Sequence, residues 1–480
     1  MVDYKINNVY QGGINSFKPS YGDVFTGYRV AANELGMTTD PRSANQIQQL
    51  NTSLNQGAIP IEVGVLNPQT FDQMPKQHFK EMERMATLTG AKISLHAPLV
   101  EPSGMGEQGW SEDAQKLAER QLTDAVLRGA ELDKNGNVPI TIHSTGMPGS
   151  EYEIGDDGKK ILKKMVVVDR ETGKAAQMLE RETLYYPHKM EEIKPEFKDL
   201  VDDLRDKLHE GQITREQFQK SVPENAFRIV PLSEGQKKTP EDRLKTINTT
   251  RWDQEVTQLI FNKERADEIL QQNYPQIQDI IQKFENKELD PKGMTPIQQQ
   301  VMQHYENAAV YLEDNQQHVE SLFHKAWKYG SEKDREKLNE LSNNFQKELA
   351  ESKNSLIEQS KAVHHLLMGM KNVHPKLFQP VEEFAIDKAS ETFANVAANA
   401  YNKFGDKAPI ISIENMMPGM AFALKKEGEK GLPGMNELII GSKEKFVKRA
   451  VMPKNRGGLG MSEAQARKQA DKMIGMTLDV

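Results

Sequence analysis

Four short apolar segments of the chain each end in a histidine or a carboxylate. Each has the length and apolar content of a buried strand, and its last residue is of a type that binds divalent metals. In the first, Pro98 stops the strand, because proline has no N–H to donate to a neighbouring strand. The end residues are His96, His143, Glu414 and Asp479, in the segments KISLHAP (92–98), PITIHSTG (139–146), PIISIENMMP (409–418) and IGMTLDV (474–480). Packing alone does not account for this repeated arrangement.

Helical segments separate these strands along the chain. The apolar spacing predicts two further strands and a set of amphipathic helices. A parallel pair of strands needs a crossover connection, which a helix supplies. The alternation therefore predicts an α/β fold with a parallel sheet. The further strands lie around 28–31 and over 58–66, and the helices over 40–55, 75–89, 111–132, 386–404 and 462–473.

The alternation stops at about residue 149 and resumes at about residue 384. The residues between them predict a β-hairpin over 163–186 and two long helices over 295–329 and 331–370. Both helices carry apolar residues at heptad spacing, so we expect them to pack as an antiparallel coiled-coil hairpin. We therefore divide the chain into three parts, with the middle part an inserted helical domain that could bind a protein partner. The parts are 1–150, 151–380 and 381–480.

Composition narrows the chemistry. The 480-residue chain has no cysteine, so any metal must be bound by histidine, aspartate or glutamate. Its net charge of −8 disfavours a general nucleic-acid binder, because such proteins carry a basic face. No apolar run approaches the roughly 18 residues of a membrane span, and the first residues lack the apolar core of a signal peptide. We therefore expect a cytoplasmic protein with no membrane partner.

The positions of the four end residues favour a metal site. In a parallel barrel the active groups lie at the carboxyl ends of the strands, where the loops form the open face. Each residue alone has an ordinary explanation, since a histidine at a strand end is usually a structural residue and Glu414 could cap the next helix. Four metal-binding residue types at four equivalent positions together favour a site for a divalent cation.

The motifs SLHAP, TIHS, SIEN and TLD, which contain His96, His143, Glu414 and Asp479, resemble strands three to six of the xylose isomerase-like TIM barrels. Within that superfamily the two histidines are most similar to those of endonuclease IV, the abasic-site endonuclease. The resemblance covers about 1–150 and 381–480, and it leaves out the insertion. It implies a TIM-type (β/α) barrel interrupted by a large, mostly helical domain.

The resemblance also implies a cofactor and a chemistry. Endonuclease IV holds a cluster of divalent metals, usually zinc, with manganese or magnesium as alternatives here. By analogy His96 and His143 bind one metal, Glu414 bridges and is the candidate catalytic residue, and Asp479 binds another metal. Such a cluster activates water against a phosphodiester, so abasic-site DNA is the implied substrate. The sugar isomerases and epimerases of the superfamily use residues matching Glu414 and Asp479 to hold one metal against a small sugar.

Two further expectations follow. Because the insertion makes up about half of the chain, a non-catalytic barrel that carries a helical interaction domain is a third hypothesis.

The superfamily motif of the sixth strand continues to a glycine and a histidine beyond the aspartate, whereas this sequence ends at Val480. We therefore expect an incomplete barrel of about six strands, and a chain that is a fragment of a longer protein.

Overall fold

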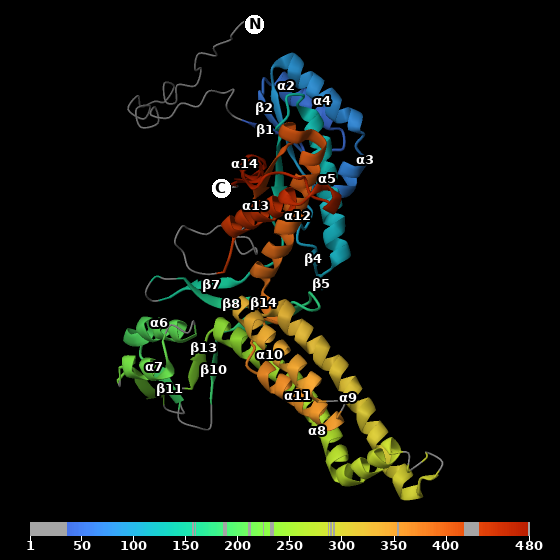
Figure 1. Ribbon diagram of the computed structural model, residues 1–480. Helices are drawn as coiled ribbons and strands as arrows, with labels where there is room; N and C mark the ends of the chain where they lie inside the picture. The colour runs from blue at the N-terminus through green and yellow to red at the C-terminus, as the bar shows by residue number, and fades with distance from the viewer. Residues whose placement is uncertain are drawn as a thin grey trace. The chain divides into compact units, whose positions relative to one another are not determined.

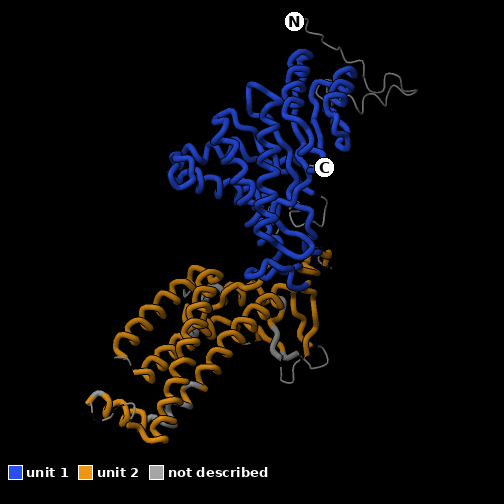
Figure 2. Tube along the Cα trace, turned by 90° about the vertical axis from the view of Figure 1, so that its right-hand side faces the viewer, with its two compact units in different colours: residues 1–151, 166–177, 380–480 blue, residues 152–165, 178–379 orange. Residues whose placement is uncertain are grey.

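The computed structural model describes most of the chain, which divides into two compact units (Figure 2). Unit 1 comprises 1–151, 166–177 and 380–480, and unit 2 comprises 152–165 and 178–379. The divisions at 151/152 and 379/380 lie one residue from the sequence boundaries, but 166–177 group with unit 1 rather than with the insertion. The described residues are 36–155, 158, 160–185, 190–209, 213–223, 225–230, 235–286, 288, 290, 293–352, 355–416 and 432–478.

A six-stranded parallel sheet forms the centre of unit 1 (Figure 1). Its strand order, β1-β2-β3-β6-β15-β16, is the order of the strands along the chain, and every pair is parallel. The predicted strand around 28–31 lies outside the described residues, and β1 lies further along the chain. The strands are β1 (Met37–Thr38), β2 (Pro60–Gly64), β3 (Lys92–His96), β6 (Pro139–His143), β15 (Ile410–Glu414) and β16 (Ile474–Thr477).

Helices connect these strands, and their ends follow local sequence signals. The Ser111 side chain accepts a hydrogen bond from the Ala114 N–H at the start of α5, and Ser462 caps α14 in the same way. Gly90 ends α4 in the left-handed conformation, with φ at +74°. The helices of unit 1 are α2 (Gln46–Asn55), α3 (Pro68–Gln73), α4 (Lys76–Thr89), α5 (Glu112–Gly129), α12 (Val381–Phe404), α13 (Met435–Val451) and α14 (Glu463–Met473).

One face of the sheet is apolar and packs against these helices. Crossovers between parallel strands are right-handed, so a sheet whose strands follow chain order receives its helices on one face. Helices that follow one another in the order α2, α4, α5, α12, α13 and α14 are in contact. Alternate strand residues such as Ile61, Leu95, Ile140 and Ile411 are buried in a core shared with the helices. The intervening strand residues therefore face away from the helices.

The sheet is open in the part of the chain that the structure describes. Its first strand, β1, pairs only with β2, and its last, β16, pairs only with β15. The predicted α/β class and the parallel sheet are confirmed, but no closed barrel is present among the described residues. None of the described helices carries an apolar stretch long enough to cross a bilayer.

A short loop hairpin packs on residues 166–177 within unit 1. The loop strands β4 (Met105–Gly106) and β5 (Gly109–Trp110) pair with each other, and the Trp110 N–H donates to the Gly173 carbonyl. Val168 is buried with Met105 and Phe384. These contacts explain why 166–177 group with unit 1.

The hairpin predicted over 163–186 is present over 160–180, whereas Leu184 belongs to a separate strand pair and residue 186 lies outside the described residues. Strand β8 (Lys160–Asp169) pairs with β9 (Ala175–Glu180), and between them the Gly173 N–H donates to the Asp169 carbonyl. Strand β8 also lies between β14 (Phe378–Pro380) and β7 (Glu151–Ile154).

The described residues of unit 2 are mostly helical, and their longest helix is α8 (Pro240–Glu285), which the sequence analysis did not single out. Helices α8, α9, α10 and α11 pack together, with Trp252 and Leu338 fully buried between them (Figure 1). The remaining elements are α6 (Lys198–His209), α7 (Arg215–Ser221), and the strand pairs β10 (Glu182–Leu184) with β13 (Gln236–Lys238) and β11 (Met190–Ile193) with β12 (Phe227–Val230).

The expected two-helix coiled coil is a four-helix arrangement instead. The first helix is α9 (Pro296–Tyr329), but the second is divided into α10 (Glu332–Glu351) and α11 (Leu356–Met370). At the end of α10 the Ser352 hydroxyl donates to the Leu349 carbonyl, which is the local competition by which serine ends a helix. The apolar stripe of α9 therefore packs partly on α8, through Val301, and partly on α11, through Ala308.

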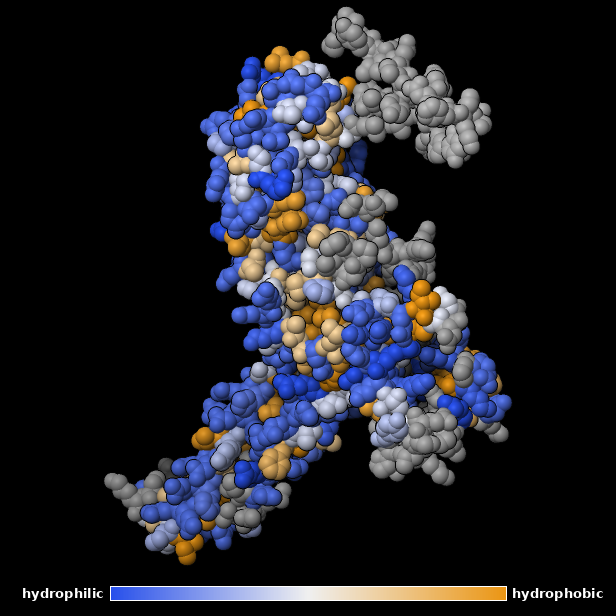
Figure 3. Space-filling model, turned by 180° about the vertical axis from the view of Figure 1, so that it is seen from behind, coloured by the Kyte–Doolittle hydropathy of each residue, from blue (hydrophilic) through white to orange (hydrophobic). Residues whose placement is uncertain are grey.

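Hydrophilic residues predominate on the described part of the face shown in Figure 3, and apolar residues form small patches on both units.

A buried glutamate on α12 gives a stability prediction. The Glu382 side chain accepts a hydrogen bond from the Ser150 N–H at 2.6 Å, and the residue is 4% exposed. Burial raises the pKa of the Glu382 carboxyl above its ordinary value of 4.5, against the opposing effect of the Ser150 hydrogen bond. The folded chain thus holds this proton more tightly than the unfolded chain does. The contribution of Glu382 to the free energy of unfolding therefore falls as pH rises from 4.5 to the folded-state pKa of its carboxyl.

We therefore expect Glu382→Gln, which mimics the protonated acid, to become more stable relative to the wild type as pH rises above 4.5. Thermal unfolding of both proteins between about pH 4.5 and 8 measures the difference, because a raised folded-state pKa changes stability only above the ordinary pKa. Melting temperatures that run parallel across this range would show that Glu382 titrates normally.

Candidate metal centre

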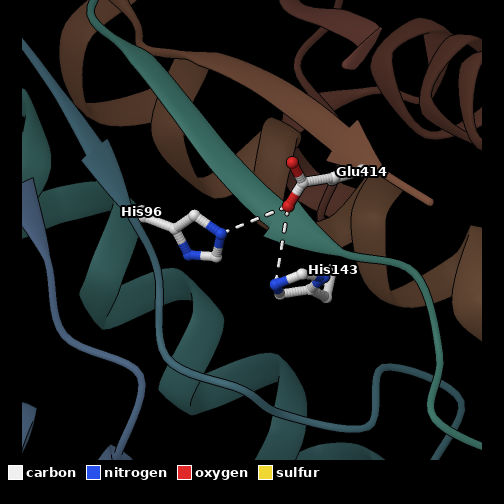
Figure 4. Close-up of side chains that lie close together, drawn as sticks. All are labelled: His96, His143 and Glu414. Carbon is white, nitrogen blue, oxygen red and sulfur yellow. Dashed lines mark hydrogen bonds and ion pairs between the residues drawn. The ribbon is translucent and has the colours of Figure 1, made fainter. Parts of the chain in front are cut away.

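His96, His143 and Glu414 are the last residues of three neighbouring strands, β3, β6 and β15. Since Ile142 and Ile413 face the helices, the residues that follow them face the other side of the sheet. The register places Glu414 directly beside His143, and His96 beside Thr141. Figure 4 shows the three side chains pointing toward one another.

One carboxylate oxygen lies close to both imidazole rings. The Oε2 atom of Glu414 is 3.2 Å from Nε2 of His96 and 3.5 Å from Nε2 of His143. The two ring centroids are 4.8 Å apart. The side chains of His96, His143 and Glu414 are 15%, 20% and 14% exposed, so the cluster is shielded but still reachable from solvent.

A backbone carbonyl sets the tautomer of His96. Its Nδ1 atom lies 3.1 Å from the Ala97 carbonyl oxygen, which can only accept a hydrogen bond. Nδ1 therefore carries the proton, and in the neutral ring the Nε2 lone pair points at the Glu414 carboxylate. Two lone pairs at this distance repel unless a proton or a cation lies between them. Metal-binding histidines commonly donate their other ring N–H to a carbonyl in this way.

The two nitrogen–oxygen spacings fit one tetrahedral cation. Two ligand atoms bound to the same zinc at 2.0–2.1 Å lie about 3.3 Å apart. The two nitrogen–oxygen distances, 3.2 and 3.5 Å, lie on either side of that value. All three ligand atoms lie within 4.8 Å of one another, and no other group of three such residues occurs in the described ranges. Two imidazole nitrogens and a carboxylate oxygen are a common ligand set of zinc.

The fourth predicted ligand, Asp479, lies outside the described residues. The strand that precedes it, β16, pairs with β15 so that Thr477 lies beside Glu414. The prediction for Asp479 is therefore neither supported nor contradicted.

Hydroxyl groups flank the cluster on the same face of the sheet, with Thr141 beside His96 and Thr477 beside Glu414, and the sequence analysis did not identify them. Ser94, Thr141, Ser412 and Thr477 each precede an end residue by two positions in the sequence. Ser94, Thr141 and Ser412 therefore share the face of the cluster, as does Thr477 beside Glu414. The Thr141 hydroxyl donates to Glu62 on β2 at 3.0 Å, and the Ser412 and Thr477 hydroxyls bond to each other. A serine or threonine stands two residues before each end residue in the sequence, and this repeated spacing could have predicted the hydroxyl groups.

Comparison with known proteins found no relative: no family model, no curated protein and no solved structure matches the chain.

Proposed function

We propose that this protein is a divalent-metal-dependent phosphodiester hydrolase resembling endonuclease IV. The observation that carries the proposal is the Glu414 oxygen that faces the Nε2 atoms of both His96 and His143. On this proposal those three residues hold a divalent cation, with zinc the expected metal, and Asp479 completes the site. A cation bound there would polarise a phosphoryl oxygen as a Lewis acid.

We further propose that the sheet of unit 1 is part of a TIM-type barrel. Its strands follow chain order and its helices contact one another in the same order, which is the arrangement of a singly wound barrel wall. The cluster lies at the carboxyl ends of the strands, where barrel enzymes place their active groups.

The roles of the protein groups follow from their positions. The carbonyl of Ala97 orients the His96 ring, so that Nε2 points into the site. The Glu414 carboxylate holds negative charge between the two rings and balances the charge of a cation. The neighbouring hydroxyls are bonded within the sheet, Thr141 to Glu62 and Ser412 to Thr477, and these bonds hold the strands beside the cluster.

A metal-dependent sugar isomerase or epimerase is the second candidate, and one observation favours it. The loops after β2, β3 and β6 (65–75, 97–111 and 144–150) contain no lysine or arginine, although they contain Asp72, Glu101 and Glu107. Proteins that bind DNA place lysine and arginine against the phosphates. An uncharged sugar needs no such groups at these three loops, whereas the segment that follows β15 in the sequence contains Lys425, Lys426 and Lys430.

Metal-dependent activity on two substrates distinguishes the candidates. We expect the full chain, stripped of metal by a chelator and reloaded with Zn²⁺, to cleave a duplex with one abasic site and to leave the intact duplex uncut. Turnover of a free aldose or ketose without cleavage would favour the isomerase. Binding of Zn²⁺ with neither activity would favour the non-catalytic hypothesis, in which the helices of unit 2 bind a protein partner.

A further inference from the structure

The loop that follows His96 contains a half-buried glutamate whose oxygens are all engaged within the protein. Glu101 Oε1 accepts hydrogen bonds from the Ser103 hydroxyl at 2.6 Å and from the Ser103 N–H at 3.2 Å. Oε2 accepts from the Thr145 hydroxyl and from the Gly146 N–H, the latter at 3.1 Å. Ser103 and Thr145 are buried. The carboxylate is therefore a fixed link and is not available to a ligand.

This link joins the two loops that leave the histidine strands. Glu101 lies five residues after His96, and Thr145 lies two residues after His143. The strand ladder itself ends close by, with the Ala97 N–H donating to the Thr141 carbonyl at 2.8 Å and the Ser144 N–H to the Glu414 carbonyl at 2.9 Å. Beyond that point the hydrogen bonds of Glu101 hold the β3 loop to the β6 loop.

A carboxylate is the group that this position requires. Each of its two oxygens accepts two hydrogen bonds, whereas a glutamine amide has one oxygen and a nitrogen that donates. In a Glu101→Gln variant the amide N–H would meet either the Gly146 N–H or the Ser103 N–H, so one donor would lose its partner. Burial raises the pKa of the Glu101 carboxyl although these hydrogen bonds oppose it, which shows that the position carries a desolvation cost.

We infer that Glu101 is a positioning residue that fixes the separation of the His96 and His143 rings, and so sets the geometry and affinity of the metal centre. This inference rests on the proposed function, because it presumes that the cluster binds a cation. Residues that orient metal ligands typically affect metal affinity by about 10–100-fold. A residue that only stabilised the loops would change the melting temperature and leave the bound metal unaffected.

Cobalt titration of the full chain tests the inference, since the visible absorption of Co²⁺ reports on its coordination geometry. We expect Glu101→Gln to bind Co²⁺ about 10–100-fold more weakly than the wild type and to change the absorption bands. Glu382→Gln is the matched control, because Glu382 is also buried in unit 1 and accepts a backbone hydrogen bond from Ser150. It should bind Co²⁺ as the wild type does.

A milder variant covers the case in which Glu101→Gln does not fold. Thr145→Val keeps the shape of the side chain and removes only its hydroxyl, and we expect a smaller loss of Co²⁺ affinity in the same direction. Wild-type affinity and spectrum in both folded variants, with only a lower melting temperature, would overturn the inference and leave the metal centre intact. A wild-type chain that binds no Co²⁺ would overturn the inference together with the proposed function.

Discussion

Replacing Glu414 by alanine is expected to lower the affinity for Zn²⁺ by at least about 100-fold, with the fold of unit 1 retained. The expectation follows from the geometry, because Glu414 Oε2 is the atom that both imidazoles face. Loss of a residue that merely orients a ligand costs about 10–100-fold, and a ligand should cost more. His96→Ala should have a similar effect. Competition with a chromophoric chelator measures both affinities, and circular dichroism checks the fold.

The chain offers a matched control for these variants. His365 Nδ1 lies 3.0 Å from Glu348 Oε2 in unit 2, and the His365 side chain is 64% exposed. This pair has the same two chemical groups, but it belongs to no group of three ligands among the described residues. His365→Ala should leave Zn²⁺ affinity unchanged. Equal losses in His365→Ala and His96→Ala would indicate adventitious binding to surface histidines.

Removing the insertion is expected to give opposite results at two different deletion boundaries. A chain that lacks 152–379 also lacks Val168, which is fully buried with Met105 and Phe384 in unit 1. A buried side chain of this size contributes about 1.5–3 kcal/mol, and its loss also exposes its neighbours. We therefore expect this shorter chain to be destabilised by several kcal/mol or to be insoluble.

A deletion of 181–377 keeps the β8–β9 hairpin and should leave a folded unit 1 that binds Zn²⁺. Strands β9 and β14 both pair with β8, so a flexible linker of about eight residues should join Glu180 to Phe378. Thermal unfolding and Zn²⁺ titration of both deletions measure the difference. Equal stability of the two chains would contradict the role assigned to 166–177, and collapse of both would show that unit 1 needs the rest of unit 2.

The sequence was sufficient to predict five of the six strands of the sheet and the convergence of His96, His143 and Glu414. Each of these strands has apolar residues at alternate positions and ends abruptly. Because side chains alternate between the two faces of a sheet, the end residue lies on the face opposite the apolar residues. His96, His143 and Glu414 therefore converge as the pattern indicates. The helices of unit 1 were predictable because apolar periodicity, capping serines and Gly90 agree with one another.

The parts that were not predicted depend on contacts between distant residues. The link from Glu101 to Thr145 spans 44 positions, and the bond from Thr141 to Glu62 spans 79. No local pattern encodes such pairs. In unit 2 the heptad spacing of α9 correctly indicated a packed helix, but the spacing does not specify the partner. The partners are α8 and α11 as well as α10.

Anomalous diffraction at the zinc absorption edge from crystals of the full chain tests the central claim most directly. The proposed site predicts a zinc ion bound by Nε2 of His96, Nε2 of His143 and Oε2 of Glu414, at about 2.0–2.2 Å from each atom. No anomalous signal at these atoms in zinc-saturated crystals, or one confined to surface histidines such as His365, would contradict the account.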